Sequence, residues 1–367
     1  MPPIRFIHAA DLHLDAAFSG LSRDIPADFA ERLRTATFTA FRRLLDLCER
    51  ESPDFLLLAG DVYNQEDASV SAQLALRDGF RRLESLSIPV FLVHGNHDPL
   101  ASRLRSVRWP GNVTVFGELP DAVPVFRKGE GTPLAIIHGA SHASGRETRN
   151  LAALFRRTEA CGLHVGLLHA TPGDADGVAR YAPFSQEDLK ASGMDYWALG
   201  HIHDRREVCR EPLAAYPGCT QGLHINEPGE KGCLLVTAEA RPDGGYAVRT
   251  SFRPLGPAVW KTLDMDLGGA ASLDELENRL RTGLDRAAAE VWSGCEMLLV
   301  RLRLQGRTEL DGLLRKGTTC AELADRLRED GSGVPRIWIK DIDVATRPCV
   351  ERGALLERED LLGEVFR

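Results

Sequence analysis

The chain has 367 residues, 43% apolar and 27% charged, which excludes intrinsic disorder, and at about 100–200 residues per domain we expect two domains. The formal net charge of −8 argues against nonspecific coating of nucleic acid, although a nuclease with a local basic groove or bound cations stays open. The eight cysteines form no Cys-x-x-Cys pair, and no apolar run approaches the ~20 residues that span a bilayer, so we expect a reduced, cytoplasmic protein without a membrane segment.

The first part of the chain alternates short apolar runs with helical patterns. We predict strands at 4–10, 54–59, 89–94, 133–138, 163–169 and 195–199. Helices are predicted at 28–50, 70–86, 148–160 and 185–191. From 206 to 253, short strands between Gly, Pro and Asn turns indicate a mainly antiparallel segment. Together these patterns predict an α/β domain with a buried sheet.

A Pro/Gly break at 253–257 marks the predicted boundary between a domain at 1–254 and a second at 255–367. Beyond the break, Ser272 with Glu275 and Thr319 with Glu322 predict the capped starts of two helices. Strands are predicted at 260–267, 298–304 and 337–344. The β-α-β-α-β order predicts a small α+β domain.

Five predicted strands end in polar residues of a restricted kind. The chain that follows them reads Asp11-Leu12-His13, Gly60-Asp61, Gly95-Asn96-His97-Asp98, His169 and Gly200-His201-Ile202-His203. In open α/β sheets, sites form outside the carboxyl ends of the strands, so we expect these ends to converge. Three of the motifs place a glycine before a candidate ligand, where a sharp turn or close backbone approach is easiest without a Cβ.

Seven of these side chains offer carboxylate, amide or imidazole ligands, which suit Mn, Fe or Zn rather than a thiolate-selective metal. They are Asp11, His13, Asp61, Asn96, His169, His201 and His203. Seven ligands exceed what one ion takes if it keeps positions open for substrate, whereas two ions sharing one carboxylate would use all of them. Two metal ions ~3.5–4 Å apart activate water and stabilise in-line displacement at phosphorus. The sequence therefore predicts a two-metal phosphoesterase.

In this order, the motifs resemble the calcineurin-like metallophosphoesterase superfamily, and further stretches resemble its DNA-repair nuclease branch, the bacterial SbcD and YhaO exonucleases. Those stretches are HAADLHLD (8–15), LLAGDVYN (57–64), VHGNHDP (93–99), LLHATPG (167–173), ALGHIH (198–203) and YPGCTQGLHINEPGEKG (216–232). The resemblance covers residues 4–253. It implies an α/β fold, a layered β-sandwich flanked by helices. The domain at 255–367 resembles the family's capping domain in order and size, which implies a role in selecting DNA ends.

Roles of individual residues also follow from the resemblance. It implies two metal positions that share Asp61, one held by Asp11, His13 and His203 and the other by Asn96, His169 and His201. His97 would stabilise the transition state and protonate the leaving oxygen, and Asp98 would orient His97. The resemblance further implies two Mn²⁺ ions, a homodimer and a partner ATPase resembling SbcC.

Our main hypothesis is a manganese-dependent DNA exonuclease of double-strand-break repair. His224, Arg103 and Arg205 are candidates for contacts with DNA. One alternative is a phosphodiesterase for cyclic or other small nucleotides, against which the extra domain argues, because small substrates need no such cap. Another is a DNA-end-binding subunit without turnover, against which the complete ligand set and His97 argue. His8, inside a predicted strand, is interpreted as a core histidine.

Overall fold

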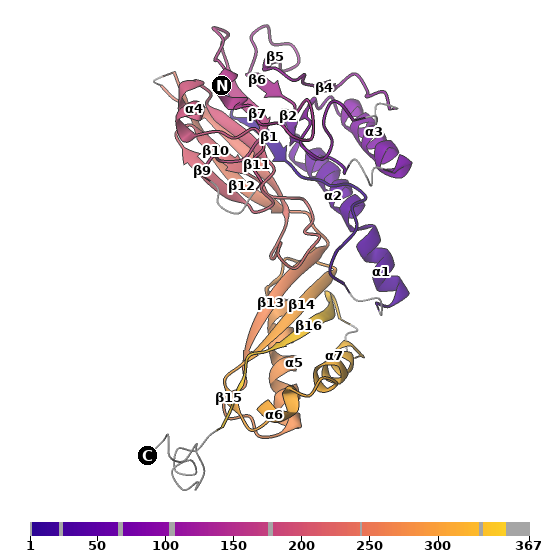
Figure 1. Cartoon of the computed structure of the whole chain (residues 1–367). Helices are drawn as coiled ribbons and strands as arrows, with labels where there is room; N and C mark the ends of the chain where they lie inside the picture. Colours follow the sequence, from indigo (N-terminus) through magenta and orange to yellow (C-terminus); the bar gives the residue numbers. More distant parts are fainter. Residues whose placement is uncertain are drawn as a thin grey trace, which may run out of the picture. The chain divides into compact units, whose positions relative to one another are not determined.

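The computed structural model describes residues 2–21, 25–64, 69–102, 107–174, 179–242, 244–329 and 333–349. The chain divides into two compact units, Met1–Pro257 and Ala258–Arg367. Figure 1 shows the elements of both units. In the described part of the chain, no helix is long and apolar enough to cross a membrane.

The first unit contains two six-stranded sheets. One consists of Ile4–Ala9 (β1), Phe55–Ala59 (β2), Val90–Val93 (β3), Val113–Val115 (β4), Gly232–Ala240 (β11) and Tyr246–Pro254 (β12), in the order β12-β11-β1-β2-β3-β4. The other consists of Asp121–Val125 (β5), Ala135–Ala140 (β6), Leu163–His169 (β7), Tyr196–Gly200 (β8), Arg206–Arg210 (β9) and Leu213–Tyr216 (β10), in the order β5-β6-β7-β8-β10-β9. The central strands of each sheet run parallel.

The two sheets pack face to face, and helices cover their outer faces. Phe55 and Leu57 of β2 lie in the core between the sheets, whereas Leu56 and Leu58 face the helices. Both faces of β2 are therefore apolar, as expected for a parallel strand buried on both sides. His8 of β1 is a satisfied core histidine, as predicted, because its ring nitrogens lie 2.9 Å from the Tyr196 hydroxyl and 3.1 Å from the Leu199 carbonyl oxygen.

Ala36–Glu51 (α2) and Val70–Ser85 (α3) pack on the first sheet, and Gln186–Ala191 (α4) packs on the second. The predicted helix at 28–50 is divided at Thr35, so that Ala27–Arg34 forms a separate helix, α1. The unit thus has the layered α/β architecture that the sequence predicted (Figure 1).

The helix predicted at 148–160 is wrong, because only Ala152–Leu154 (η1) forms a short 3-10 helix in this described stretch. Leu151, Ala152 and Phe155 are buried as the pattern required. The chain then turns away, since the backbone N–H of Arg157 donates to the Ser192 carbonyl at 2.9 Å. Pairing with the segment after α4 therefore replaces further helical turns.

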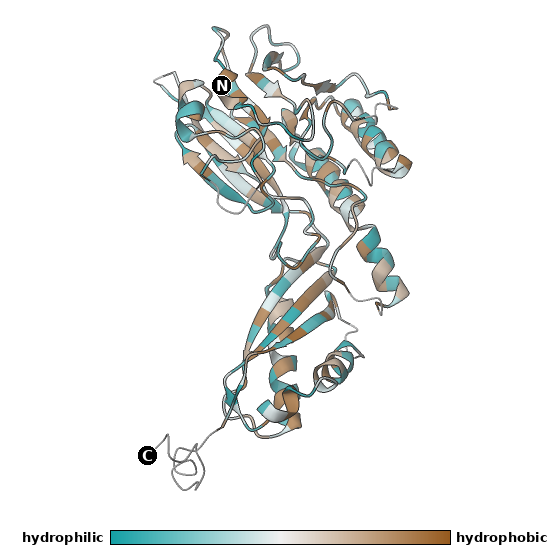
Figure 2. Cartoon of the chain, viewed as in Figure 1, coloured by the Kyte–Doolittle hydropathy of each residue, from teal (hydrophilic) through white to brown (hydrophobic). Residues whose placement is uncertain are grey.

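The second unit has a parallel sheet of Ala258–Asp266 (β13), Met297–Gln305 (β14) and Arg336–Val344 (β16), in the order β13-β14-β16. Its helices are Leu273–Glu290 (α5), Asp311–Leu314 (α6) and Thr319–Glu329 (α7), and Arg307–Thr308 (β15) pairs with Arg347–Pro348 (β17). The Ser272 hydroxyl caps α5 by accepting from the Glu275 N–H at 3.2 Å. Figure 2 shows hydrophobic and hydrophilic residues mixed along these strands, as expected where one face of a sheet is buried.

Candidate metal centre

The predicted ligands leave the carboxyl ends of strands in both sheets. Asp11 and His13 follow β1, Asp61 follows β2 and Asn96 follows β3. His169 is the last residue of β7, and the two histidines of the Gly-His-x-His motif follow β8. Because the two sheets face each other, these ends meet at one edge of the sandwich, and all seven side chains come together there.

Asp11, His13 and His203 form one group of candidate ligands, whose donor atoms lie within 4.8 Å of one another. The Nε2 atoms of His13 and His203 are 3.1 Å apart, and His203 Nε2 is 3.9 Å from Asp11 Oδ1. Two nitrogen ligands about 2.1 Å from one ion, at a right angle, lie about 3 Å apart. The spacing therefore fits a shared cation.

Asp61, His169 and His201 form a second such group. Asn96 Oδ1 completes it, lying 3.1 Å from His169 Nε2 and 3.2 Å from His201 Nδ1. Asp61 Oδ2 is 3.3 Å from His169 Nε2 and 3.9 Å from His13 Nε2, so this carboxylate lies between the two groups. The donor set fits two divalent cations that share Asp61.

The backbone around the ligands is tightly constrained, as the glycines in the motifs predicted. A Cβ on Gly95 would lie 2.2 Å from Asp61 Oδ1, and a Cβ on Gly200 would lie 1.8 Å from the Ala59 carbonyl oxygen. Several ligands also have left-handed backbone angles, with a φ of 51° at Asp11 and 48° at Asp61. Such angles store strain that the surrounding structure must hold, and they cluster at functional sites.

Burial keeps two of the candidate ligand histidines neutral and able to bind a cation. It lowers the pKa of His13 to about 4 and that of His201 to about 3, so both imidazoles keep free lone pairs at neutral pH. Burial also raises the pKa of Asp11 to about 6. Although burial opposes charge on His169 as well, the Asp61 carboxylate raises the pKa of His169 to about 9. A cation bound there would replace a proton on His169.

We therefore expect the affinity for Mn²⁺ to rise as the pH increases through neutrality. At a pH below the His169 pKa of about 9, the imidazole carries a proton that the metal must displace. The affinity for Mn²⁺ should therefore rise by up to about tenfold for each pH unit in this range. Competition with a chromophoric chelator over a pH series measures this slope, and calorimetry in buffers of different ionisation enthalpy counts the protons released. An affinity independent of pH would contradict the prediction.

His97 lies exposed at the rim of the centre, with its ring centroid 5.1 Å from that of His13. Its backbone N–H donates to Asp61 Oδ1 at 3.0 Å. The buried Asp98 carboxylate accepts from the N–H groups of Val62 at 3.0 Å and Gly95 at 2.7 Å. Within the described residues it makes no hydrogen bond to the His97 ring. These bonds link Asp98 to the loop backbone that leads to His97, and the orientation of His97 by Asp98 stays a prediction.

The candidate DNA contacts are less closely tied to the centre. Arg205 is exposed, with its guanidinium carbon 4.1 Å from the centre of the Phe252 ring. His224 is half-buried, and its Nδ1 accepts from the Asn226 N–H at 3.2 Å. Arg103 lies outside the described residues. The role of these residues in binding DNA stays a prediction.

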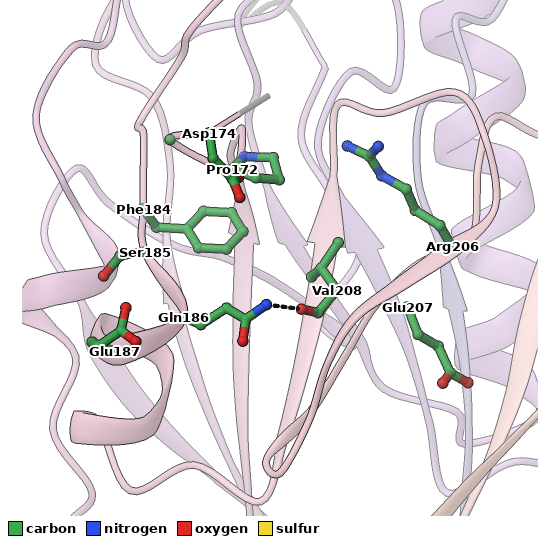
Figure 3. Close-up of a pocket in the computed structure, with 10 residues that line it drawn as sticks. Pro172, Asp174, Phe184, Ser185, Gln186, Glu187, Arg206, Glu207 and Val208 are labelled. Atoms are coloured by element: carbon green, nitrogen blue, oxygen red, sulfur yellow. Dashed lines mark hydrogen bonds between the residues drawn. The ribbon is translucent and has the colours of Figure 1, made fainter. Parts of the chain in front are cut away.

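A surface pocket of about 750 Å³ opens beside α4 and β9 (Figure 3). Its polar lining includes the carboxylates of Asp174, Glu187 and Glu207 together with the guanidinium of Arg206. The seven candidate ligands are not among its lining residues. The surplus of carboxylates disfavours a phosphate group there, so the pocket is not the expected binding site for a nucleotide.

Sequence reasoning missed the side chains that hold the ligands in place. His13 Nδ1 donates to Asn64 Oδ1 at 2.6 Å, and His203 Nδ1 donates to Glu227 Oε1 at 2.6 Å. The one available signal for Glu227 was its position in the conspicuous stretch at 216–232. Cys219 lies within 4.8 Å of the donor atoms of His203 and Glu227. Burial raises the pKa of the Cys219 thiol well above its usual range, so the thiol stays protonated.

Comparisons with known proteins extend these observations. A sequence model described as calcineurin-like phosphoesterase matches residues 4–205, and one described as metallophosphoesterase YhaO, middle domain, matches residues 260–347. The metallophosphoesterase YhaO of Bacillus subtilis (strain 168) is 36% identical over 94% of this chain and 82% of its own length. The DNA double-strand break repair protein Mre11 of Aeropyrum pernix is 27% identical over 79% of this chain and 69% of its own length. The solved structure of TT1561 from Thermus thermophilus is 13% identical, covering 68% of this chain and 99% of that one, with a TM-score of 0.39.

Proposed function

Because the chain belongs to the calcineurin-like phosphoesterase family, we propose that it is a manganese-dependent DNA exonuclease. The observation that carries this proposal is the pair of ligand groups that share Asp61. Two ions bound there supply positive charge and an activated water for in-line attack at phosphorus. The remaining chemistry falls to side chains of the protein.

His97 is the proposed catalytic acid. Its ring is exposed beside His13, so it can reach the leaving oxygen of a substrate bound at the metals. A positioned histidine that gives a proton to a leaving oxygen contributes about 100- to 10,000-fold in rate. Asp98 has a positioning role, because its carboxylate joins the loop before His97 to the loop after β2.

DNA is the proposed substrate because similarity to a DNA double-strand break repair protein extends over 79% of the chain. We further propose that the domain at 255–367 caps the site and selects DNA ends, and that the protein works as a homodimer with an SbcC-like ATPase. The net charge of −8 predicts weak, salt-sensitive binding of DNA without such a partner.

The test compares the hydrolysis of three substrates in the presence of Mn²⁺. They are end-labelled linear duplex DNA, closed circular duplex DNA and the small diester bis(p-nitrophenyl) phosphate. We expect the linear DNA to shorten from its ends, the circle to stay intact, and EDTA to abolish both linear-DNA and small-diester hydrolysis. Hydrolysis of the small diester alone, also with an SbcC-like ATPase present, would instead indicate a small-nucleotide phosphodiesterase. Binding of DNA ends by metal-loaded protein without any hydrolysis would indicate a binding subunit.

A further inference from the structure

The ligand histidines are held on their second ring nitrogen by different kinds of acceptor. His169 Nδ1 donates to the Ala59 backbone carbonyl at 2.9 Å, and His13 Nδ1 donates to an amide oxygen. His203 Nδ1 donates to the carboxylate of Glu227 at 2.6 Å. A carboxylate on the far nitrogen of a metal-binding imidazole fixes its tautomer and makes the near nitrogen more basic. The first ligand group therefore has a support that is chemically distinct from the backbone support of His169.

Glu227 is itself fixed by the loop that carries it. Its second oxygen, Oε2, accepts from the Leu223 N–H at 2.7 Å, and its own N–H donates to the His224 carbonyl at 2.9 Å. The exposed fraction of the side chain is 21% for Glu227 and 30% for His203. Both oxygens of the carboxylate are thus engaged, one with the loop backbone and one with the imidazole.

The same segment also holds the backbone of His203. The buried ammonium of Lys231 donates to the His203 carbonyl oxygen at 3.0 Å and to Asp204 Oδ1 at 3.1 Å. Gly218, with a φ of 81°, approaches so closely that a Cβ there would lie 2.7 Å from the same carbonyl oxygen. The segment at 216–232 therefore constrains His203 at its ring and at its main chain.

We propose that Glu227 is a positioning residue that turns His203 Nε2 toward Asp11 and His13 and thereby sets the affinity of the first metal position. The inference rests on the proposed function only in that divalent cations bind the centre, and it does not depend on DNA being the substrate. Loss of such a partner typically weakens metal binding by about 10- to 100-fold. Because Glu227 contacts His203 and no ligand of the second group among the described residues, we expect the weakening to affect one of two ions.

The experiment compares the variants Glu227→Ala, Glu227→Gln and Glu227→Asp of the full chain. Each protein is titrated with Mn²⁺, and electron paramagnetic resonance measures the binding. We expect Glu227→Ala to bind one ion about 10- to 100-fold more weakly and the other unchanged. Glu227→Gln keeps the shape of the side chain and one of its two acceptor oxygens, which can still accept from the imidazole while the bond to the Leu223 N–H is lost, so it should fold and show a smaller loss than Glu227→Ala. Partial recovery in Glu227→Asp would support positioning.

Asp204→Asn is the matched control, because it removes the charge of a carboxylate next to His203 in sequence, does not touch the imidazole and keeps an amide oxygen that can accept from the Lys231 ammonium. We expect it to leave both affinities near those of the unmodified protein. In metal-free protein at a pH where the ring is neutral, ¹⁵N chemical shifts should report the Nδ1–H tautomer of His203, and Glu227→Ala should lose that preference. Equal weakening of both ions, or unchanged affinity in all Glu227 variants, would overturn the proposal. Failure of DNA cleavage alone would contradict the proposed function and leave this inference intact.

Discussion

Replacing His97 with alanine should lower the turnover number for DNA hydrolysis by about 100- to 10,000-fold while both metal ions stay bound. The imidazole of His97 lies beside the metal centre and is not a member of either ligand group. Its contact with Asp61 is made by the backbone N–H, which the alanine variant retains. Metal binding and catalysis should therefore separate in this variant. Metal content by atomic spectroscopy and single-turnover cleavage of labelled DNA measure the two effects.

A substrate with a good leaving group distinguishes proton donation from other roles of His97. The p-nitrophenolate of bis(p-nitrophenyl) phosphate departs readily without a proton, whereas the sugar oxygen of DNA needs one. If His97 acts as the general acid, His97→Ala should lose much less activity toward the small diester than toward DNA. Equal losses with both substrates would argue against proton donation, and loss of bound metal would show that His97 supports the centre itself.

The sequence was most informative where the fold and the chemistry depend on the same residues. The strands that lead to the candidate ligands are largely buried on both sides, so they read as mainly apolar runs, and β2, Phe55–Ala59, is apolar throughout. Each run stops at a ligand motif, because the chain must leave the sheet where the site begins. For this reason the ends of β2 and β8 were predicted to within one residue, at 54–59 against Phe55–Ala59 and at 195–199 against Tyr196–Gly200.

The rest depends on contacts between distant parts of the chain, which local patterns do not carry. Glu227 lies 24 positions after His203, and no spacing rule links a loop carboxylate to an imidazole at that separation. The same reason explains the error at 148–160, where the apolar spacing is helical but a backbone contact between Arg157 and Ser192 draws the chain away. Asp98 is a third case, because the Val62 N–H from which its carboxylate accepts belongs to another loop.

Gly200→Ala should reduce both the free energy of unfolding and the metal content. The Cβ of the variant would lie 1.8 Å from the Ala59 carbonyl oxygen, a backbone atom that cannot rotate aside, and 3.0 Å from His169 Nδ1. That same carbonyl accepts the hydrogen bond that orients His169, at 2.9 Å. Overpacking that forces the backbone to shift typically costs about 1–3 kcal/mol and occasionally more.

The loss of bound metal in Gly200→Ala should exceed the loss that lower stability alone produces. The new Cβ would push the ends of β8 and β2 apart, and these ends carry candidate ligands from both sheets. Gly117→Ala is the matched control, since Gly117 is exposed and a Cβ there would meet no heavy atom of the described residues within 4 Å. Urea unfolding of the metal-free proteins gives the free energy, and Mn²⁺ titration under native conditions gives the affinity. If Gly200→Ala unfolds like the control and binds both ions normally, the close approach of β8 to β2 does not hold the centre together. If stability falls while the affinity of the folded protein is unchanged, the glycine serves the packing of the two sheets and the ligand geometry is independent of it.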